Sequence, residues 1–138
     1  MLPTVQEHNH APAIFIGFGV ATDITIHVME SHGLLKDGIV MYDLHMTPMV
    51  HKTLCFWSDK ESALFQTLRH CVQYSWNKAH TDQNTPQQLG AIHYHQMSAH
   101  SLRASTMKIL QKYNVRFCKE EVLSLESEHG KTVVSGSE

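Results

Sequence analysis

The 138-residue chain lacks an excess of charge of either sign. Eleven Lys and Arg stand against thirteen Asp and Glu, so the formal net charge is −2 at pH 7. Nucleic-acid-binding domains present clustered basic side chains to phosphates, and the sequence has no such cluster. We therefore expect no nucleic-acid partner. With 42% hydrophobic residues, the chain has the composition of a globular domain.

Cysteines and long hydrophobic runs are also scarce. An odd number of cysteines with no CxxC argues against a disulfide framework and favours buried, reduced thiols in a cytoplasmic protein. The longest apolar run, 11–21, is shorter than the roughly 20 residues that a membrane-spanning helix needs. The start of the chain has no signal-peptide pattern. The three cysteines are Cys55, Cys71 and Cys118.

Histidine is abundant, with twelve residues. His93 and His95 would lie on one face of a predicted strand, and His70, Cys71 and His100 are further candidate ligands for zinc or copper. Their spacing matches no compact metal motif, so we predict solvent-facing strand residues and no metal site.

The first 43 residues predict a strand, a helix and a second strand. A short apolar run predicts a strand over 13–16, buried on both faces as in a parallel sheet. A helix follows over 20–31, and a second apolar strand over 39–42. Such a unit has parallel strands. The apolar face of the helix would carry Ala21, Ile24 and Val28.

The rest of the chain has alternating strand and helix patterns and no internal boundary. We expect a flexible leader over 1–12, one ordered unit over 13–134 and a frayed tail over 135–138. Helices are predicted over 61–70 and 100–113. Strand character, around a polar break at 81–86, is found over 53–57, 71–76, 88–97, 115–117, 122–125 and 132–134.

The turn between the first strand and the helix has the pattern of a dinucleotide fingerprint. Gly17 can form the tight turn, and Gly19 lets a pyrophosphate approach the backbone. The first helical amides, at Val20, Ala21 and Thr22, would face that phosphate with the positive end of the helix dipole. Thr22 stands where the third glycine is expected and allows less close packing.

Asp43 lies 21 residues after Thr22, at the end of the second predicted strand. A carboxylate at about 20 residues is expected to accept hydrogen bonds from the adenosine ribose hydroxyls. The alternative is a tight strand-to-helix turn that binds nothing, with Asp43 as a turn residue.

Several segments together resemble the lycopene cyclases of carotenoid biosynthesis. Lys52-Thr53-Leu54-Cys55-Phe56-Trp57 is similar to a basic-Thr-Trp-Cys-Phe-Trp motif of that family. Ser75-Trp76-Asn77-Lys78, the segments 33–37 and 94–98, and the helix 100–113 also match in place. The similarity runs over about 13–134.

The resemblance implies an α/β fold with a Rossmann-like dinucleotide-binding domain of the glutathione-reductase type, three-layered around a central, largely parallel sheet. It implies FAD, reduced by NAD(P)H, in a non-redox cyclisation of the ends of lycopene. Gly17, Gly19 and Asp43 would hold the ADP part of FAD, and Val122 would lie near the adenine. A complete member would contact a carotenoid and the membrane surface.

The chain also departs from the family. Leu54 replaces a Trp, and the later acidic motif, the second flavin segment and the carotenoid tunnel are missing. We therefore expect an incomplete member with weak FAD binding, assign no catalytic residue, and expect self-association through uncovered apolar surface. Trp57 and Trp76 suggest a carotenoid or flavin wall, but we predict that they fill the core. The alternative is a small non-catalytic α/β module for nucleotide binding or interaction.

Overall fold

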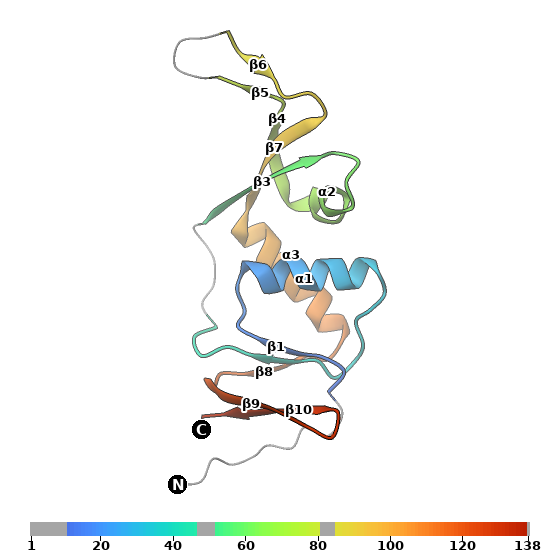
Figure 1. Ribbon diagram of the computed structural model, residues 1–138, viewed down its shortest axis with the longest axis vertical. Coiled ribbons are helices and arrows are strands. Elements are labelled where there is room, and N and C mark those ends of the chain that lie inside the picture. The colour runs from blue at the N-terminus through green and yellow to red at the C-terminus, as the bar shows by residue number, and fades with distance from the viewer. Residues whose placement is uncertain (1–10, 47–51, 81–84, 138) are drawn as a thin grey trace.

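The computed structural model describes residues 11–46, 52–80 and 85–137. These residues form a mixed α/β fold with a small parallel sheet and separate antiparallel sheets. The molecule is elongated (Figure 1). The parallel sheet and a C-terminal hairpin lie at one end, an antiparallel sheet lies at the other, and two helices lie between them. Of the expected leader over 1–12 and the polar break over 81–86, residues 1–10 and 81–84 lie outside the described residues.

The parallel sheet has the strand order β1-β2-β8. Its strands are β1 (Ile14–Ile16), β2 (Val40–Tyr42) and β8 (Arg116–Cys118). The hairpin of β9 (Val122–Glu128) and β10 (Lys131–Gly136) covers one face of the sheet and the helices cover the other, as Figure 1 shows. β10 continues through two residues that were expected in a frayed tail.

The central strand β2 is buried along its whole length because each face of the sheet is covered. Met41 packs with Ile26 and Ile39 in the cluster beneath the helices. Val40 and Tyr42 pack in a second cluster under the hairpin. This alternation explains why the strand is a continuous apolar run in the sequence.

β1 does not share this burial. It is an edge strand with β2 on one side, and Ile16 is 47% exposed. Phe15 packs against the cluster beneath the helices and Ile14 against the cluster under the hairpin, so both faces of this strand are covered as expected, but only in part.

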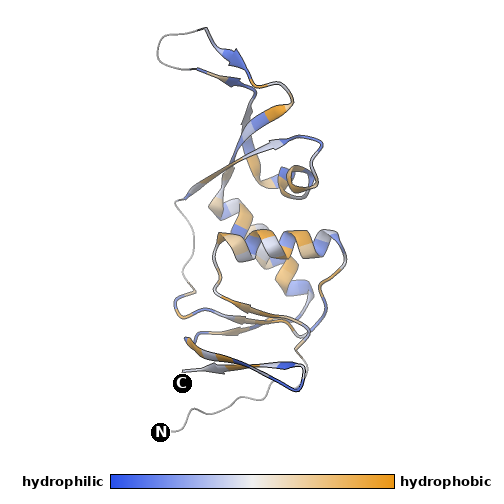
Figure 2. Cartoon of the chain, in the orientation of Figure 1, coloured by the Kyte–Doolittle hydropathy of each residue, from blue (hydrophilic) through white to orange (hydrophobic). Residues whose placement is uncertain are grey.

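The two long helices are α1 (Val20–Ser31) and α3 (Ala99–Lys112). Both carry hydrophobic and hydrophilic bands along their length (Figure 2), as helices with one buried face do. The predicted bounds of α1 are correct, but its predicted apolar face is only partly so, because Ile24 packs against a core cluster and Ala21 does not. Ala21 is exposed, and the fully buried positions are Asp23, Ile26 and His27.

The antiparallel sheet has the order β3-β7-β4. α2 and η1 lie on one face of it, and a cluster around Leu68, Met97 and Leu102 joins it to α1 and α3. The bounds are β3 (Thr53–Asp59), α2 (Ala63–Leu68), η1 (Arg69–Cys71), β4 (Val72–Trp76), β5 (Lys78–Ala79), β6 (Gln87–Gln88) and β7 (Ile92–Ser98).

The two faces of this sheet differ from expectation. Trp57 and Trp76 are 57% and 43% exposed, so they do not fill the core. His95, expected to face solvent, is fully buried between the rings of Phe56 and Phe65. Period-two alternation placed side chains on common faces correctly, but the covered face is fixed by where α2 packs.

The cysteines are all free, as expected, and Cys71 and Cys118 are buried. Cys55 is exposed, contrary to the prediction, because it lies on the same open sheet face as Trp57. No helix among the described residues combines the length and the hydropathy needed to cross a membrane.

Candidate functional site

The glycine turn lies at the carboxyl end of β1 and leads directly into α1. Gly17 has a φ of +85°, a conformation that favours glycine, and its amide donates to the carbonyl of Tyr42 at 2.7 Å. This bond fixes the turn beside the end of β2. The predicted tight turn at Gly17 is therefore confirmed in its geometry.

Gly19 is the N-cap of α1, and no side chain of the described residues caps this helix start. Its φ of −104° is open to any residue, and a Cβ added there would meet no atom of the described residues within 4 Å. Every other glycine has a positive φ or a close neighbour at its Cβ position. Neither backbone conformation nor internal packing requires glycine here, so the bare backbone is available to an incoming group.

Val20, Ala21 and Thr22 form the first turn of α1, as predicted. The amides of a first turn have no partner within the helix. Thr22 points its hydroxyl back to the Gly17 carbonyl and donates to it at 2.6 Å. The residue in the position of the third glycine therefore holds the turn to the helix.

Asp43 directly follows β2, and its carboxylate lies at the opening of α1. Oδ2 accepts from the amide of Phe18 at 2.7 Å, and Oδ1 accepts from the amides of His45 and Met46 at 2.9 and 2.7 Å. The Phe18 bond is the main cause that lowers the pKa of Asp43, and partial burial opposes it. A carboxylate can accept about four hydrogen bonds, so about one position remains for a ligand.

A buried ion pair behind the turn was not foreseen. Asp23 is fully buried in the first turn of α1, and Arg103 of α3 donates to its Oδ1 from Nε at 3.0 Å and to Oδ2 from Nη2 at 3.0 Å. The same Nη2 donates to the Phe18 carbonyl at 2.6 Å, and the guanidinium carbon lies 3.5 Å from the Phe18 ring centre. Arg103 thus connects α3 to both the turn and the helix.

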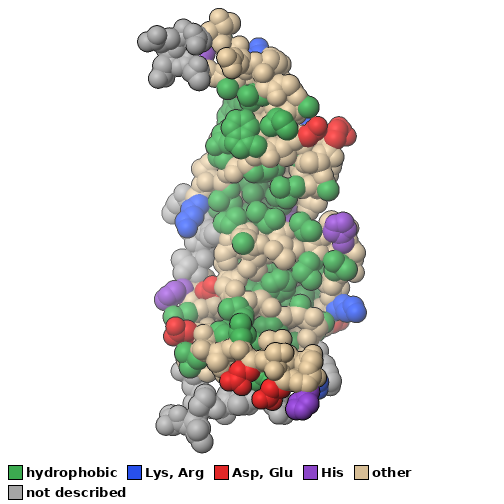
Figure 3. Space-filling view, viewed as in Figure 1, with side chains coloured by type: hydrophobic (Ala, Val, Ile, Leu, Met, Phe, Trp, Pro, Cys, Tyr) green, Lys and Arg blue, Asp and Glu red, His purple; other side chains and the backbone are tan. Residues whose placement is uncertain are grey.

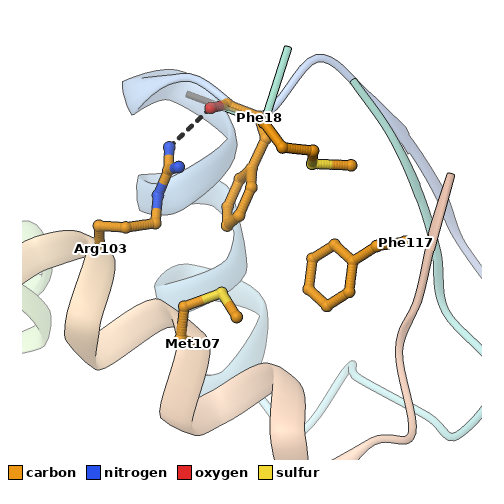
Figure 4. A pocket seen from close by; sticks show the side chains of 5 residues that line it. Phe18, Arg103, Met107 and Phe117 are labelled. Carbon is orange, nitrogen blue, oxygen red and sulfur yellow. Dashed lines mark hydrogen bonds between the residues drawn. The ribbon is translucent and has the colours of Figure 1, made fainter. Parts of the chain in front are cut away.

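An open cavity of about 400 Å³ adjoins the turn on the side of α3. Figure 4 shows Phe18 and Phe117 facing it from two sides, with Arg103 and Met107 on α3. Met46 completes the lining, which is almost entirely apolar. The Phe18 and Phe117 ring centres are 6.1 Å apart. The cavity lies at the carboxyl ends of the parallel strands, where open α/β sheets bind ligands.

Val122 lies elsewhere. It starts β9 and packs against the cluster that contains Tyr42, Cys118 and Val134 under the hairpin. The structure therefore brings Gly17, Gly19 and Asp43 together and places Val122 beyond the end of β8. A contact between Val122 and adenine stays a prediction.

Among the described residues, no three His, Cys, Asp or Glu side chains are gathered as metal ligands. His27 and His70 are close, with ring centres 5.3 Å apart, and His93 and His95 are 6.0 Å apart. The chain matches no protein-family model, and no curated protein is significantly similar to it.

Proposed function

We propose that this chain binds the ADP part of FAD and is the nucleotide-binding portion of a flavoprotein similar to the lycopene cyclases. The observation that carries the proposal is the Asp43 carboxylate, held 2.7 Å from the Phe18 amide at the uncapped start of α1. A ribose hydroxyl can take the remaining acceptor position while the pyrophosphate meets the free amides.

The glycine positions fit this ligand. A phosphate needs backbone amides that no side chain shields. Apart from Gly19 and its neighbours in the chain, no atom of the described residues lies within 4 Å of the place that a Cβ on Gly19 would occupy. The dipole of the twelve-residue α1 adds a partial positive charge at the same point. Phosphate binding would therefore explain the glycine at position 19, which the packing of the fold does not require.

The cavity fits the base of the nucleotide. Its volume of about 400 Å³ exceeds that of a purine ring, and its apolar wall includes Phe18, Met107 and Phe117. Apolar and aromatic walls with few polar groups are typical of small-molecule sites. The guanidinium of Arg103 adds no uncompensated charge, because Asp23 neutralises it.

FAD, when bound, would supply the flavin that the resemblance associates with cyclisation of lycopene ends, with NAD(P)H as its reductant. The described residues of this chain would bind and orient the ADP part only. We assign none of them to proton transfer. Contacts with a carotenoid or a membrane surface are proposed only on the resemblance to the lycopene cyclases.

One observation favours the alternative of a non-binding α/β module. The Asp43 carboxylate accepts three hydrogen bonds from backbone amides, and its role in holding the 43–46 turn is enough to explain them. On that view Asp43 needs no ligand, and neither ADP nor FAD changes the thermal stability of the protein.

Gly19→Asp separates the two possibilities. An aspartate N-cap stabilises a helix by a few tenths of a kcal/mol or more relative to glycine. Its negative charge and volume would occupy the site of the pyrophosphate, so the variant should melt at or above the wild-type temperature and lose ADP and FAD binding. Isothermal titration with ADP and FAD, together with thermal melting, measures both effects.

Asp43→Asn is the second variant. It should weaken the binding of ADP more than that of inorganic pyrophosphate, because the side-chain NH2 that replaces one carboxylate oxygen cannot accept a hydrogen bond from a ribose hydroxyl. Wild-type protein that binds neither ADP nor FAD contradicts the proposal. Full ADP affinity in Gly19→Asp contradicts the site.

A further inference from the structure

The outer edge of β3 is a second feature that can bind another molecule, and it is independent of the glycine turn. Among the described residues, β3 pairs with a strand on one side only, where β7 matches it residue by residue from Thr53 to Asp59. We call the opposite side the β3 edge, defined by Thr53, Cys55 and Trp57.

The backbone N–H and C=O groups of these three residues point outward from the open edge. The carbonyl of Lys52 accepts from the amide of Ala99 at 3.1 Å, so Lys52 faces the β7 side. Backbone groups alternate in direction along an antiparallel strand. The N–H and C=O groups of Thr53, Cys55 and Trp57 are therefore directed away from β7.

Among the described residues, this edge lacks the usual protection against pairing, apart from Asp59 at the end of β3. Residues 53–58 include no proline and no charged side chain, and the register with β7 has no bulge. The other edges are protected. β1 and β8 have three residues each and β5 and β6 have two, β4 and β10 each have a register shift, and β9 carries Glu126 and Glu128.

We propose that a second copy of this chain pairs antiparallel with the β3 edge and joins the two sheets into one. An antiparallel pair related by a two-fold axis places outward-directed residues opposite outward-directed residues, so the edge is complementary to itself. With Cys55 on the axis, Thr53 of each copy lies opposite Trp57 of the other, and the pairing makes about six backbone hydrogen bonds.

Charge favours this register over its neighbour. With Cys55 on the axis, Lys52 lies opposite Ser58 of the second copy. A shift that places Phe56 on the axis would set Lys52 opposite Lys60 of the second copy, and like charges across a strand pair are unfavourable. In the register with Cys55 on the axis, the Cys55 side chains of the two copies lie opposite each other.

The aromatic side chains of the open face support the same arrangement. Trp57, Tyr94 and Trp76 form one row across β3, β7 and β4, with ring centres 4.6 and 6.1 Å apart. In Figure 3, hydrophobic side chains gather over this end of the molecule. Pairing at β3 would set the end of this row against Thr53 of the second copy and cover part of Trp57.

The test compares two lysine variants of the full chain by sedimentation velocity over a concentration series. Cys55→Lys places two like charges at the axis and should weaken the dimer about tenfold or more. Leu123→Lys, on the exposed hairpin strand β9, removes a 60% exposed hydrophobic side chain elsewhere and should leave the dimer unchanged. Circular dichroism confirms that each variant is folded.

A short homobifunctional thiol reagent provides the second measurement, because Cys71 and Cys118 are buried and Cys55 is exposed. It should yield a covalent dimer from wild type, and Cys55→Ser should dimerise without being crosslinked. The proposal is overturned if wild type sediments as a monomer throughout, if Cys55→Lys dimerises like wild type, or if Leu123→Lys weakens the dimer equally. ADP binding, measured on the same samples, reports separately on the glycine turn.

Discussion

The two ends of this molecule differ in which side chains they bury: a charged side chain is buried at one end, and aromatic side chains are exposed at the other. At the parallel end, Asp23 is fully buried, yet its charge is matched by Arg103. At the antiparallel end, the aromatic rings of Trp57 and Trp76 remain exposed on the open face of the sheet. The first end uses charged groups to shape a turn inside the protein, while the second presents a surface to its surroundings.

The largest expected effect comes from breaking the buried pair at the parallel end. Arg103→Leu leaves the Asp23 carboxylate buried without a cation and removes the donor to the Phe18 carbonyl. Removing one partner of a buried ion pair costs about 3–5 kcal/mol, so the free energy of unfolding should fall by that amount. Urea denaturation measures it.

The matched control is the exposed pair between Lys112 and Glu30, whose lysine is 63% exposed. Lys112→Leu should change the free energy of unfolding by about 0–1 kcal/mol. A double variant, Asp23→Leu with Arg103→Leu, should recover part of the loss because no uncompensated charge remains. Equal effects of Arg103→Leu and Lys112→Leu would show that Arg103 is not needed to neutralise Asp23.

This pair also shows the limit of sequence analysis. The patterns around Gly17, the helix over 20–31 and Asp43 are local, so the β1-α1-β2 unit and its turn were predictable. Asp23 and Arg103 are 80 positions apart, and only the packing of α3 on α1 brings them together. One indication of a buried charge was present in the sequence, because Asp23 lies one helical turn before Ile26 in a helix that must bury one face.

The cavity and the open sheet face were beyond sequence analysis for the same reason. Phe18, Met107 and Phe117 come from a turn, a helix and a strand that are distant in the chain. Alternation predicted that Trp57 and Cys55 share a face, but not that α2 packs on the opposite one. Long-range packing decides which face of a strand is covered.

A medium effect is expected from pH at the buried histidines, because burial lowers the pKa of both His27 and His95. At the antiparallel end, His95 forms hydrogen bonds with Ser75 and the Ser58 carbonyl. In α1, Nε2 of His27 is buried with no hydrogen-bond partner among the described residues. Burial, and then the nearby His70, lower the pKa of His27, although the Leu102 backbone, Asp23 and Glu30 act in the opposite direction.

A lowered folded-state pKa means that the unfolded chain binds the proton first. Stability contributed by neutral His27 is therefore complete above the unfolded pKa of about 6.5 and is lost as pH falls towards the folded pKa, by up to about 1.4 kcal/mol per pH unit. His27→Gln should flatten the stability profile between pH 7 and 5, as measured by urea denaturation at each pH. An unchanged slope in His27→Gln, or the same flattening in the exposed His32→Gln, would rule out this assignment.

The smallest expected effect is at the exposed aromatic row. Trp76 contacts Tyr94 and Tyr74 but is 43% exposed, so Trp76→Ser should lower the free energy of unfolding of the monomer by about 1 kcal/mol or less. Leu68→Ala, beneath the same sheet and fully buried, should cost about 2–5 kcal/mol.

Protein concentration sharpens this last comparison. In dilute protein, urea denaturation reports on the monomer, and the difference between the two substitutions tests whether the aromatic row lies outside the core. If Trp76→Ser costs as much as Leu68→Ala at every concentration, the row is covered within one chain and the open face does not exist in solution. If its cost grows only at high concentration, association covers the face around Trp76, a contact that pairing at the β3 edge does not make, because β7 lies between β3 and β4.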